Sequence, residues 1–217
     1  FLTRTPMGNK GTFGKVLVLA GSGAMCGAAV LCARAVLASG AGMVKVVTEE
    51  RNRTPLFCAL PEAMADFWKE DEPLPEEALL QDLAWADAVV AGPGLSKSRT
   101  AKELLVFTVQ HTEVPLVLDA DALNIIAEHR ELLDLLHEGC ILTPHMKEFE
   151  RLAGKSVNDF ERLNKLSIFA NQYRVHIVLK GAHSVIATPD RRLFFNMSGN
   201  PGMACLLYTS PSPRDAH

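Results

Sequence analysis

Residues 175–204 read VHIVLKGAHSVIATPDRRLFFNMSGNPGMA, and this stretch decides the fold class. Val175 to Leu179 is a short apolar run typical of a buried strand, and it ends in Lys180-Gly181. Two further short strands are predicted at 184–188 and 193–196, separated by a Pro-Asp turn. Glycine lets the backbone approach an anion closely, so free N–H groups can point at it. The stretch therefore predicts a cradle for phosphates and a flat base.

The bulk composition fits one globular domain of 217 residues, 48% of them hydrophobic. A net charge of −3 argues against nucleic acid or an anionic membrane surface as a partner. No apolar run approaches the ~20 residues of a membrane helix, and no signal peptide is visible. We therefore expect a cytoplasmic protein that does not bind membranes.

The cysteines are five in number and contain no Cys-x-x-Cys pair. An odd, scattered set favours reduced, buried thiols over a disulfide or zinc framework. The chain starts at Phe1 rather than methionine, so we expect its N-terminus to be incomplete. The cysteines are Cys26, Cys32, Cys58, Cys140 and Cys205.

Short apolar runs alternate with helical segments along most of the chain. Between 51 and 77 the sequence is rich in proline and acidic residues, and we expect a solvated connection with a helical piece at each end. The alternation predicts an α/β fold in which a mostly parallel sheet carries helices on both faces. Strands are expected at Val16, Met43, Ala88, Leu116, Cys140 and Val175.

The loops after these strands are the candidate site, because ligands of open α/β sheets bind at the carboxyl ends of strands. Five loops should share this edge: GSG (21–23), GPGL (92–95), DAD (119–121), TPH (143–145) and KGAHS (180–184). They supply small residues, two acids, two histidines and one lysine. No nucleophile elbow of the form G-x-S-x-G is present. This combination indicates phosphoryl transfer or nucleotide binding.

Two of these loops raise more specific expectations. Asp121 is placed to cap the helix that follows it, whereas Asp119 is either structural or a ligand for a magnesium-water shell. Thr143 is predicted as a helix N-cap with Pro144 at the first helical position. His145 would then lie in the first turn, where free N–H groups favour anions.

Several phosphate and metal motifs are absent. GSGAMCG has its third glycine one place too late for G-x-G-x-x-G, and Glu49 is only a weak candidate for the acid that such a site needs. Gly154-Lys155-Ser156 lacks the upstream glycine of a P-loop, because that position is Phe149. A dinucleotide site of the Rossmann type is therefore not expected.

Eight segments occur together in one order and spacing: KGTFGKVLVLAGS, MCGAA, GAGMVKV, AGPGLS, VLDADALN, LTPHMKEFERL, VLKGAHSVI and GNPGMA. Together they resemble the ADP- or ATP-dependent NAD(P)H-hydrate dehydratases of the ribokinase-like superfamily. The resemblance covers about residues 10–204. It implies a three-layer ribokinase-like fold whose C-terminal part is missing here.

The resemblance also implies an activity. Such an enzyme repairs NADHX or NADPHX, in which water has added across the nicotinamide ring. It uses ADP or ATP with Mg²⁺ to phosphorylate the added hydroxyl, and then eliminates phosphate to restore NADH or NADPH. The implied partners are NADHX or NADPHX and an adenine nucleotide, with a homo-oligomer and an upstream NAD(P)H-hydrate epimerase domain as further expectations.

The resemblance implies roles for nine residues, which fall into two groups. Three of them would contact the hydrated nicotinamide nucleotide: Ala28, Gly94 and His145. Six would contact the adenine nucleotide: Lys180, Gly181, Ala182, His183, Ser184 and, at the phosphate end, Asn200. Lys147 stands where many members have glycine, so the local loop shape can differ.

The last segment, 205–217, departs from the family pattern. It reads CLLYTSPSPRDAH where the family has a G-[ST]-G-D segment whose aspartate is the general base. The segment has no glycine, and Asp215 lies outside the motif. We therefore expect residues 1–204 to be an incomplete dehydratase domain, 205–217 to be non-native, and the chain to be inactive. The alternatives are a ribokinase-like kinase of hydroxymethylpyrimidine or a sugar, or a nucleotide-binding remnant without catalysis.

Overall fold

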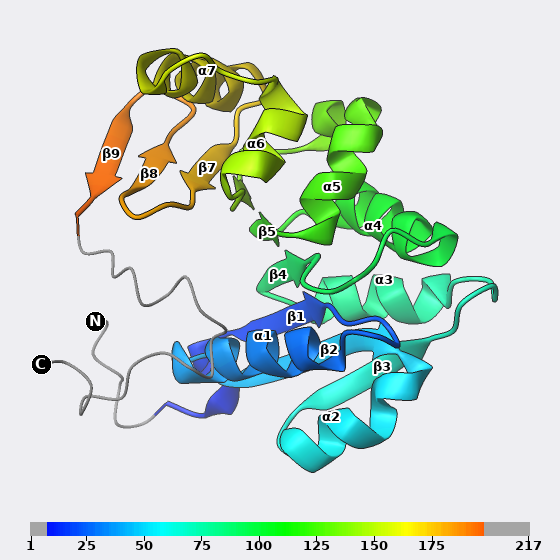
Figure 1. Cartoon of the computed structure of the whole chain (residues 1–217). Helices are drawn as coiled ribbons and strands as arrows, with labels where there is room; N and C mark the ends of the chain where they lie inside the picture. Colours follow the sequence, from blue (N-terminus) through cyan, green and yellow to red (C-terminus); the bar gives the residue numbers. More distant parts are fainter. Residues whose placement is uncertain (1–7, 198–217) are drawn as a thin grey trace, which may run out of the picture.

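The computed structural model describes residues 8–197, so Asn200 and the segment 205–217 lie outside the described residues. These residues form a nine-stranded sheet in the order β3-β2-β1-β4-β5-β6-β7-β8-β9 (Figure 1). The strands are β1 (Lys15–Leu19), β2 (Met43–Glu49), β3 (Met64–Trp68), β4 (Ala88–Ala91), β5 (Leu116–Leu118), β6 (Cys140–Leu142), β7 (His176–Leu179), β8 (Ser184–Ala187) and β9 (Leu193–Asn196). The helices are α1 (Cys26–Ala38), α2 (Arg53–Ala59), α3 (Glu76–Trp85), α4 (Arg99–His111), α5 (Asp121–Glu128), α6 (Met146–Ala153) and α7 (Asp159–Gln172), with short 3₁₀ helices η1 (Lys10–Phe13), η2 (Glu50–Asn52) and η3 (Arg130–Leu135).

The sheet is parallel from β3 to β7 and antiparallel only at β7–β8 and β8–β9. The predicted α/β class with a mostly parallel sheet is thus confirmed. A helix between consecutive parallel strands returns the chain to the same end of the sheet, so β1, β2, β4, β5, β6 and β7 point the same way. Their carboxyl ends meet at one edge.

The helices cover the two faces of the sheet unequally. Helices α3 to α7 pack on one face in a continuous core that contains Leu118, Leu142 and Ile177. On the other face, α1 and α2 pack over β1 and β2 around Val18 and Val46. Within the described residues, α1 and α2 are the only α-helices on that second face.

The prediction of a solvated connection over residues 51–77 is wrong for the central part of this segment. The helical pieces are present, as α2 and the start of α3, but the chain between them forms the edge strand β3. Its last residue, Trp68, is only 2% exposed and joins the main core. The strand forms although the local sequence is rich in acids and prolines, because parallel pairing with β2 and burial of Trp68 stabilise it.

Two other expectations concern cysteines and membranes. The four described cysteines are free thiols; Cys140 is buried, Cys26 and Cys32 are half-buried, and Cys58 is exposed. The prediction of buried thiols is therefore wrong for Cys58. A search of residues 8–197 finds no helix with the length and apolar character needed to cross a membrane.

Candidate functional site

Backbone hydrogen bonds join the predicted loops along the carboxyl edge of the sheet. Gly21 N donates to Pro93 O at 2.9 Å, Thr143 N donates to Leu118 O at 3.0 Å, and Lys180 N donates to Pro144 O at 2.8 Å. Together with a bond from Asp119 N to Ala91 O at 3.1 Å, they follow the strand order β1-β4-β5-β6-β7. The expected common edge is therefore present.

Gly94 and the start of α1 are in direct contact. Gly94 has φ +62°, and a Cβ built on it would lie 2.7 Å from Cβ of Ala28 and 2.9 Å from Cβ of Met25. Only glycine tolerates both this backbone conformation and this close approach. Ala28 and Gly94, which the resemblance assigns to one ligand, thus lie side by side.

Three buried polar side chains hold the 21–23 loop. Thr48 Oγ1 donates to Gly21 O at 3.0 Å, and Asn52 Nδ2 donates to Ser22 O at 3.1 Å and to Thr48 Oγ1 at 2.9 Å. Glu49 accepts a hydrogen bond from Gly23 N and pairs with Arg51 Nε at 2.8 Å. The carboxylate of Glu49 is therefore engaged with its own chain. No local sequence pattern predicts these three side chains as supports of the loop.

Replacing Asn52 by alanine should destabilise the fold by about 1–3 kcal/mol, because Asn52 is 1% exposed and its loss leaves buried acceptors unsatisfied. Urea denaturation measures this free energy of unfolding. Asn171→Ala is the matched control, since the exposed Asn171 amide also donates to a backbone carbonyl, Pro189 O at 2.7 Å. We expect the control to change stability by under about 0.5 kcal/mol. Equal effects of the two substitutions would contradict the buried role of Asn52.

His145 caps helix α6, which corrects the predicted Thr143 cap. His145 has an extended backbone, and its Nδ1 accepts from Lys147 N at 3.1 Å and Glu148 N at 3.3 Å. The helix starts two residues later than expected because the chain from Thr143 stays paired with its neighbours, including a parallel bridge between His145 and Lys180. His145 therefore precedes the first turn of the helix and uses a ring nitrogen to cap it.

The cap also determines which ring nitrogen of neutral His145 carries the proton. Because Nδ1 accepts backbone hydrogen bonds, we assign the ring proton of the neutral form to Nε2. Nε2 lies 3.3 Å from Glu148 Oε1, and Glu148 Oε2 accepts from His145 N at 2.8 Å. The His145 side chain is 49% exposed, so Nε2–H can also face a ligand. The arrangement suits a hydrogen-bond donor rather than a base.

Asp121 is the first residue of α5, and the N-cap position is Ala120. The predicted cap is wrong because the Asp121 carboxylate turns to the neighbouring loop, where Oδ2 accepts from Ser96 N at 2.9 Å. Ala120 has φ +51°, an uncommon conformation for a residue with a side chain. Asp121 thus fastens the loop after Gly94 to the loop after β5.

A pocket of about 400 Å³ opens beside the end of β7. Its lining includes Lys180, Gly181, Ala182 and His183, four of the six residues that the resemblance assigns to the adenine nucleotide. A Cβ added at Gly181 would meet only His183 O, at 3.6 Å, so the glycine leaves open space there. Apolar walls come from Met146, Leu163, Leu179, Val185, Phe195 and Met197. Ser184, the fifth described residue of that set, starts β8 and does not line the pocket.

Lys180 also reaches toward the other half of the edge. Its Nζ lies 2.6 Å from Asp119 Oδ1, with side chains 42% and 30% exposed. The pair spans β6 and links the end of β7 to the end of β5. The charge of Asp119 acts nearby on α1, where burial first and this carboxylate second raise the pKa of the Cys32 thiol to about 11. The thiol is therefore neutral at physiological pH.

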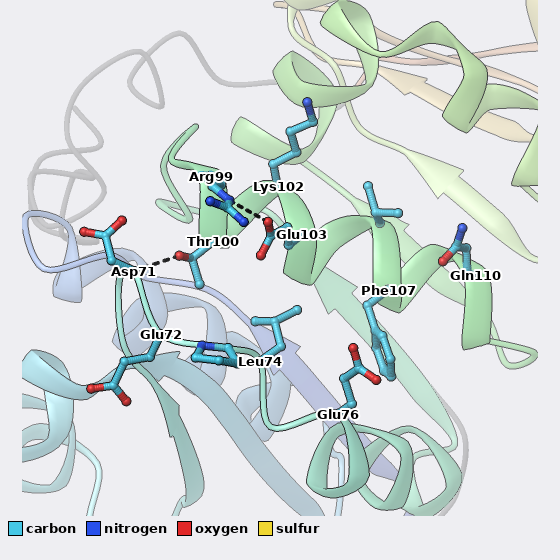
Figure 2. Close-up of a pocket in the computed structure, with 12 residues that line it drawn as sticks. Asp71, Glu72, Leu74, Glu76, Arg99, Thr100, Lys102, Glu103, Phe107 and Gln110 are labelled. Carbon is cyan, nitrogen blue, oxygen red and sulfur yellow. Dashed lines mark hydrogen bonds and ion pairs between the residues drawn. The ribbon is translucent and has the colours of Figure 1, made fainter.

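A larger cleft, about 580 Å³, lies elsewhere, between the segment before α3 and helix α4 (Figure 2). Arg99 Nε pairs with Glu103 Oε1 at 2.8 Å on its wall, and Asp71 N donates to Thr100 Oγ1 at 3.2 Å. None of the nine predicted site residues lines it. We therefore do not assign the site to this cleft, although it is the larger of the two.

The sequence comparisons identify the family of the chain. A family model described as NAD(P)H-hydrate dehydratase matches residues 16–205. The chain belongs to this family. It is 36% identical over 211 residues to the bifunctional NAD(P)H-hydrate repair enzyme Nnr of Moorella thermoacetica, covering 93% of this chain and 39% of that one. It is 34% identical over 199 residues to the ADP-dependent (S)-NAD(P)H-hydrate dehydratase of Lactiplantibacillus plantarum, covering 90% and 68%.

Solved structures confirm the ribokinase-like fold. A ribokinase-like superfamily protein from Enterococcus faecalis superposes with a TM-score of 0.80 at 27% identity, covering 94% of this chain and 69% of that one. The ADP/ATP-dependent NAD(P)H-hydrate dehydratase from Bacillus subtilis, co-crystallized with ATP/Mg²⁺, gives a TM-score of 0.72 at 31% identity, covering 94% and 70%. The chain thus spans about two fifths of the bifunctional relative named above and about two thirds of the dehydratases.

Proposed function

We propose that this chain is the dehydratase domain of a nicotinamide-nucleotide repair enzyme, which uses ADP or ATP to dehydrate NADHX or NADPHX. The single observation that carries the proposal is the Lys180-Gly181 pocket at the carboxyl edge of the sheet, in a chain of the dehydratase family. A phosphate donor and a hydroxyl acceptor need adjoining sites for direct transfer. In the proposal, both sites lie along one row of loops at this edge.

The adenine nucleotide would occupy the pocket beside β7. Its apolar walls suit a flat base, and the Lys180 ammonium suits phosphate oxygens. The open space at Gly181 lets the nucleotide approach the backbone. Ala182, His183 and Ser184 extend the same turn, and a role for Asn200 stays a prediction.

The hydrated nicotinamide nucleotide would lie over Ala28, Gly94 and His145. Ala28 and Gly94 are in contact, so a ligand lying across the start of α1 would meet both. The Nε2–H of His145 is available as a donor at the next loops along the edge. Placed there, the hydroxyl of the substrate would face the nucleotide across the end of β6.

Mg²⁺ would accompany the nucleotide. Within residues 8–197 no cluster of three histidine, cysteine or carboxylate side chains is present that could hold a metal by itself. Magnesium in nucleotide sites is commonly held by phosphates, waters and one or two carboxylates. Asp119 is already paired with Lys180, so phosphates and waters would supply the ligands of the ion, and the ion would neutralise phosphate charge during transfer.

We also propose that residues 205–217 are not native to the domain. The family model match ends at 205, and the segment lacks the glycines and aspartate expected of the catalytic loop. Loss of a general base costs ~10²–10⁴-fold in rate. Sequencing the gene beyond the codon for Ala204 tests this proposal. An uninterrupted native frame encoding CLLYTSPSPRDAH would overturn it.

A thermal-shift panel separates the dehydratase from the alternative of a small-molecule kinase, which the relatives' names support less. We expect NADPHX and ADP each to raise the melting temperature and hydroxymethylpyrimidine or sugars to leave it unchanged. The reverse result, stabilisation by hydroxymethylpyrimidine and none by NADPHX, contradicts the proposed function. A cytoplasmic location, an upstream epimerase domain and a homo-oligomer remain predictions.

A further inference from the structure

We propose that Asp119 is a specificity-determining residue, which pairs with Lys180 and competes with nucleotide phosphates for its ammonium group. The inference rests on the proposed function and assigns a role to a residue outside both predicted ligand groups. Its basis is the 2.6 Å contact between Asp119 Oδ1 and the ammonium of Lys180, a residue that lines the pocket beside β7.

The carboxylate of Asp119 is the fixed member of the pair. Its backbone N donates to Ala91 O at 3.1 Å, and its carbonyl accepts from Ala122 N at 3.1 Å. Its Oδ1 accepts from Ala120 N at 2.9 Å. Gly92 packs so closely that an added Cβ would lie 1.9 Å from Asp119 O. These contacts leave the carboxylate little freedom to follow a moving partner.

Lys180 is the adjustable member. Its backbone is anchored to Pro144 O at 2.8 Å, but its ammonium sits on a flexible four-carbon stem. The ammonium can therefore turn from Asp119 toward a ligand in the pocket without moving the strand. Since both side chains are partly exposed, the pair is weak, and a ligand with sufficient negative charge can displace it.

This competition sets how tightly phosphate-bearing ligands bind relative to uncharged ones. A polyphosphate carries more negative charge than the carboxylate and can gain the ammonium, whereas a ligand without phosphate cannot. The fixed negative charge of Asp119 also repels any phosphate that fails to recruit Lys180. Asp119 therefore lowers the affinity for all phosphate-bearing ligands. The affinity that is left depends on contact between the phosphate and Lys180.

Isothermal titration calorimetry of the whole chain with ADP and with adenosine tests the proposal. Asp119→Asn removes the charge but keeps an oxygen that can accept from Lys180. We expect it to tighten ADP binding about threefold to fivefold, the range of a partly exposed ion pair, and to leave adenosine binding unchanged. Asp119→Glu keeps the charge and should keep the wild-type ratio of the two affinities.

Glu128→Gln is the matched control, because it breaks the comparably exposed pair of Lys97 Nζ and Glu128 Oε1, 2.6 Å apart and outside the pocket lining. It should change neither affinity. An ADP affinity that is unchanged or weaker in Asp119→Asn overturns the inference, as does an equal change for adenosine, which indicates a purely structural role. If the wild-type chain binds neither adenosine nor ADP, the result contradicts the proposed nucleotide site, and this inference is overturned with it.

Discussion

Replacing Lys180 by alanine will weaken ADP binding by roughly tenfold to a hundredfold. A hydrogen bond to a charged group contributes about 1.5–3 kcal/mol, and each ~1.4 kcal/mol is a factor of ten in affinity. Lys180 and Arg162 both line the pocket beside β7, and Lys180 adjoins the open backbone at Gly181, where a phosphate would approach. Isothermal titration calorimetry of the folded variant measures the effect. Because the ion pair with Asp119 is partly exposed, we expect thermal stability to change little.

Lys97→Ala is the control for this substitution. Lys97 is half-exposed and pairs with a carboxylate at 2.6 Å, as Lys180 does, but it does not line the pocket. We expect it to leave ADP binding within about twofold of the wild-type value. If both lysine variants bind ADP as well as the wild type, the nucleotide does not use the pocket beside β7.

Replacing Gly92 by alanine will destabilise the fold by about 3–5 kcal/mol, which is exceptional for one added methyl group. Gly92 has φ +121°, and its added Cβ would lie 1.9 Å from Asp119 O and 2.7 Å from Ala122 Cβ. The strand tip of β5 must therefore shift to accept the substitution. Thermal denaturation should show a melting temperature lower by about 10 °C for a domain of this size.

Gly27→Ala is the contrasting control. Gly27 lies in α1, and a Cβ built on it meets nothing within 4 Å. Alanine has the higher helix propensity, so we expect a change between zero and about 1 kcal/mol of stabilisation. Equal melting temperatures for Gly92→Ala and Gly27→Ala would show that the 92–95 loop can shift at little cost in stability. The packing of this loop against Asp119 would then not order the site.

Much of the fold could be predicted from the sequence because buried parallel strands are short apolar runs. Val16, Ala88 and Leu116 each begin or lie near such a run, and the loops after them were expected at one edge. The strand β3 was missed because its residues alternate poorly and its stability comes from pairing with β2 rather than from its own pattern. Trp68 was the available signal, since a tryptophan in an acidic segment suggests burial.

Some features of the candidate site could likewise be predicted from the sequence, and others could not. Lys180 and Gly181 were found because a lysine and a glycine after an apolar strand form a local pattern. The caps at Asp121 and Thr143 were wrong because contacts from distant segments, Ser96 and Lys180, decide where those helices begin. The hydrogen bonds of Thr48 and Asn52 join residues far apart in the chain, so their spacing carried no signal.

The most direct test of the proposed dehydratase is a spectrophotometric assay of NADH recovery from NADHX. The protein should be expressed with the gene's own sequence beyond Ala204, and assayed with ADP and with ATP. We predict recovery of NADH that depends on the nucleotide and falls sharply in Lys180→Ala. A protein that carries the G-[ST]-G-D segment and binds ADP, but leaves NADHX unchanged with either nucleotide, would contradict it.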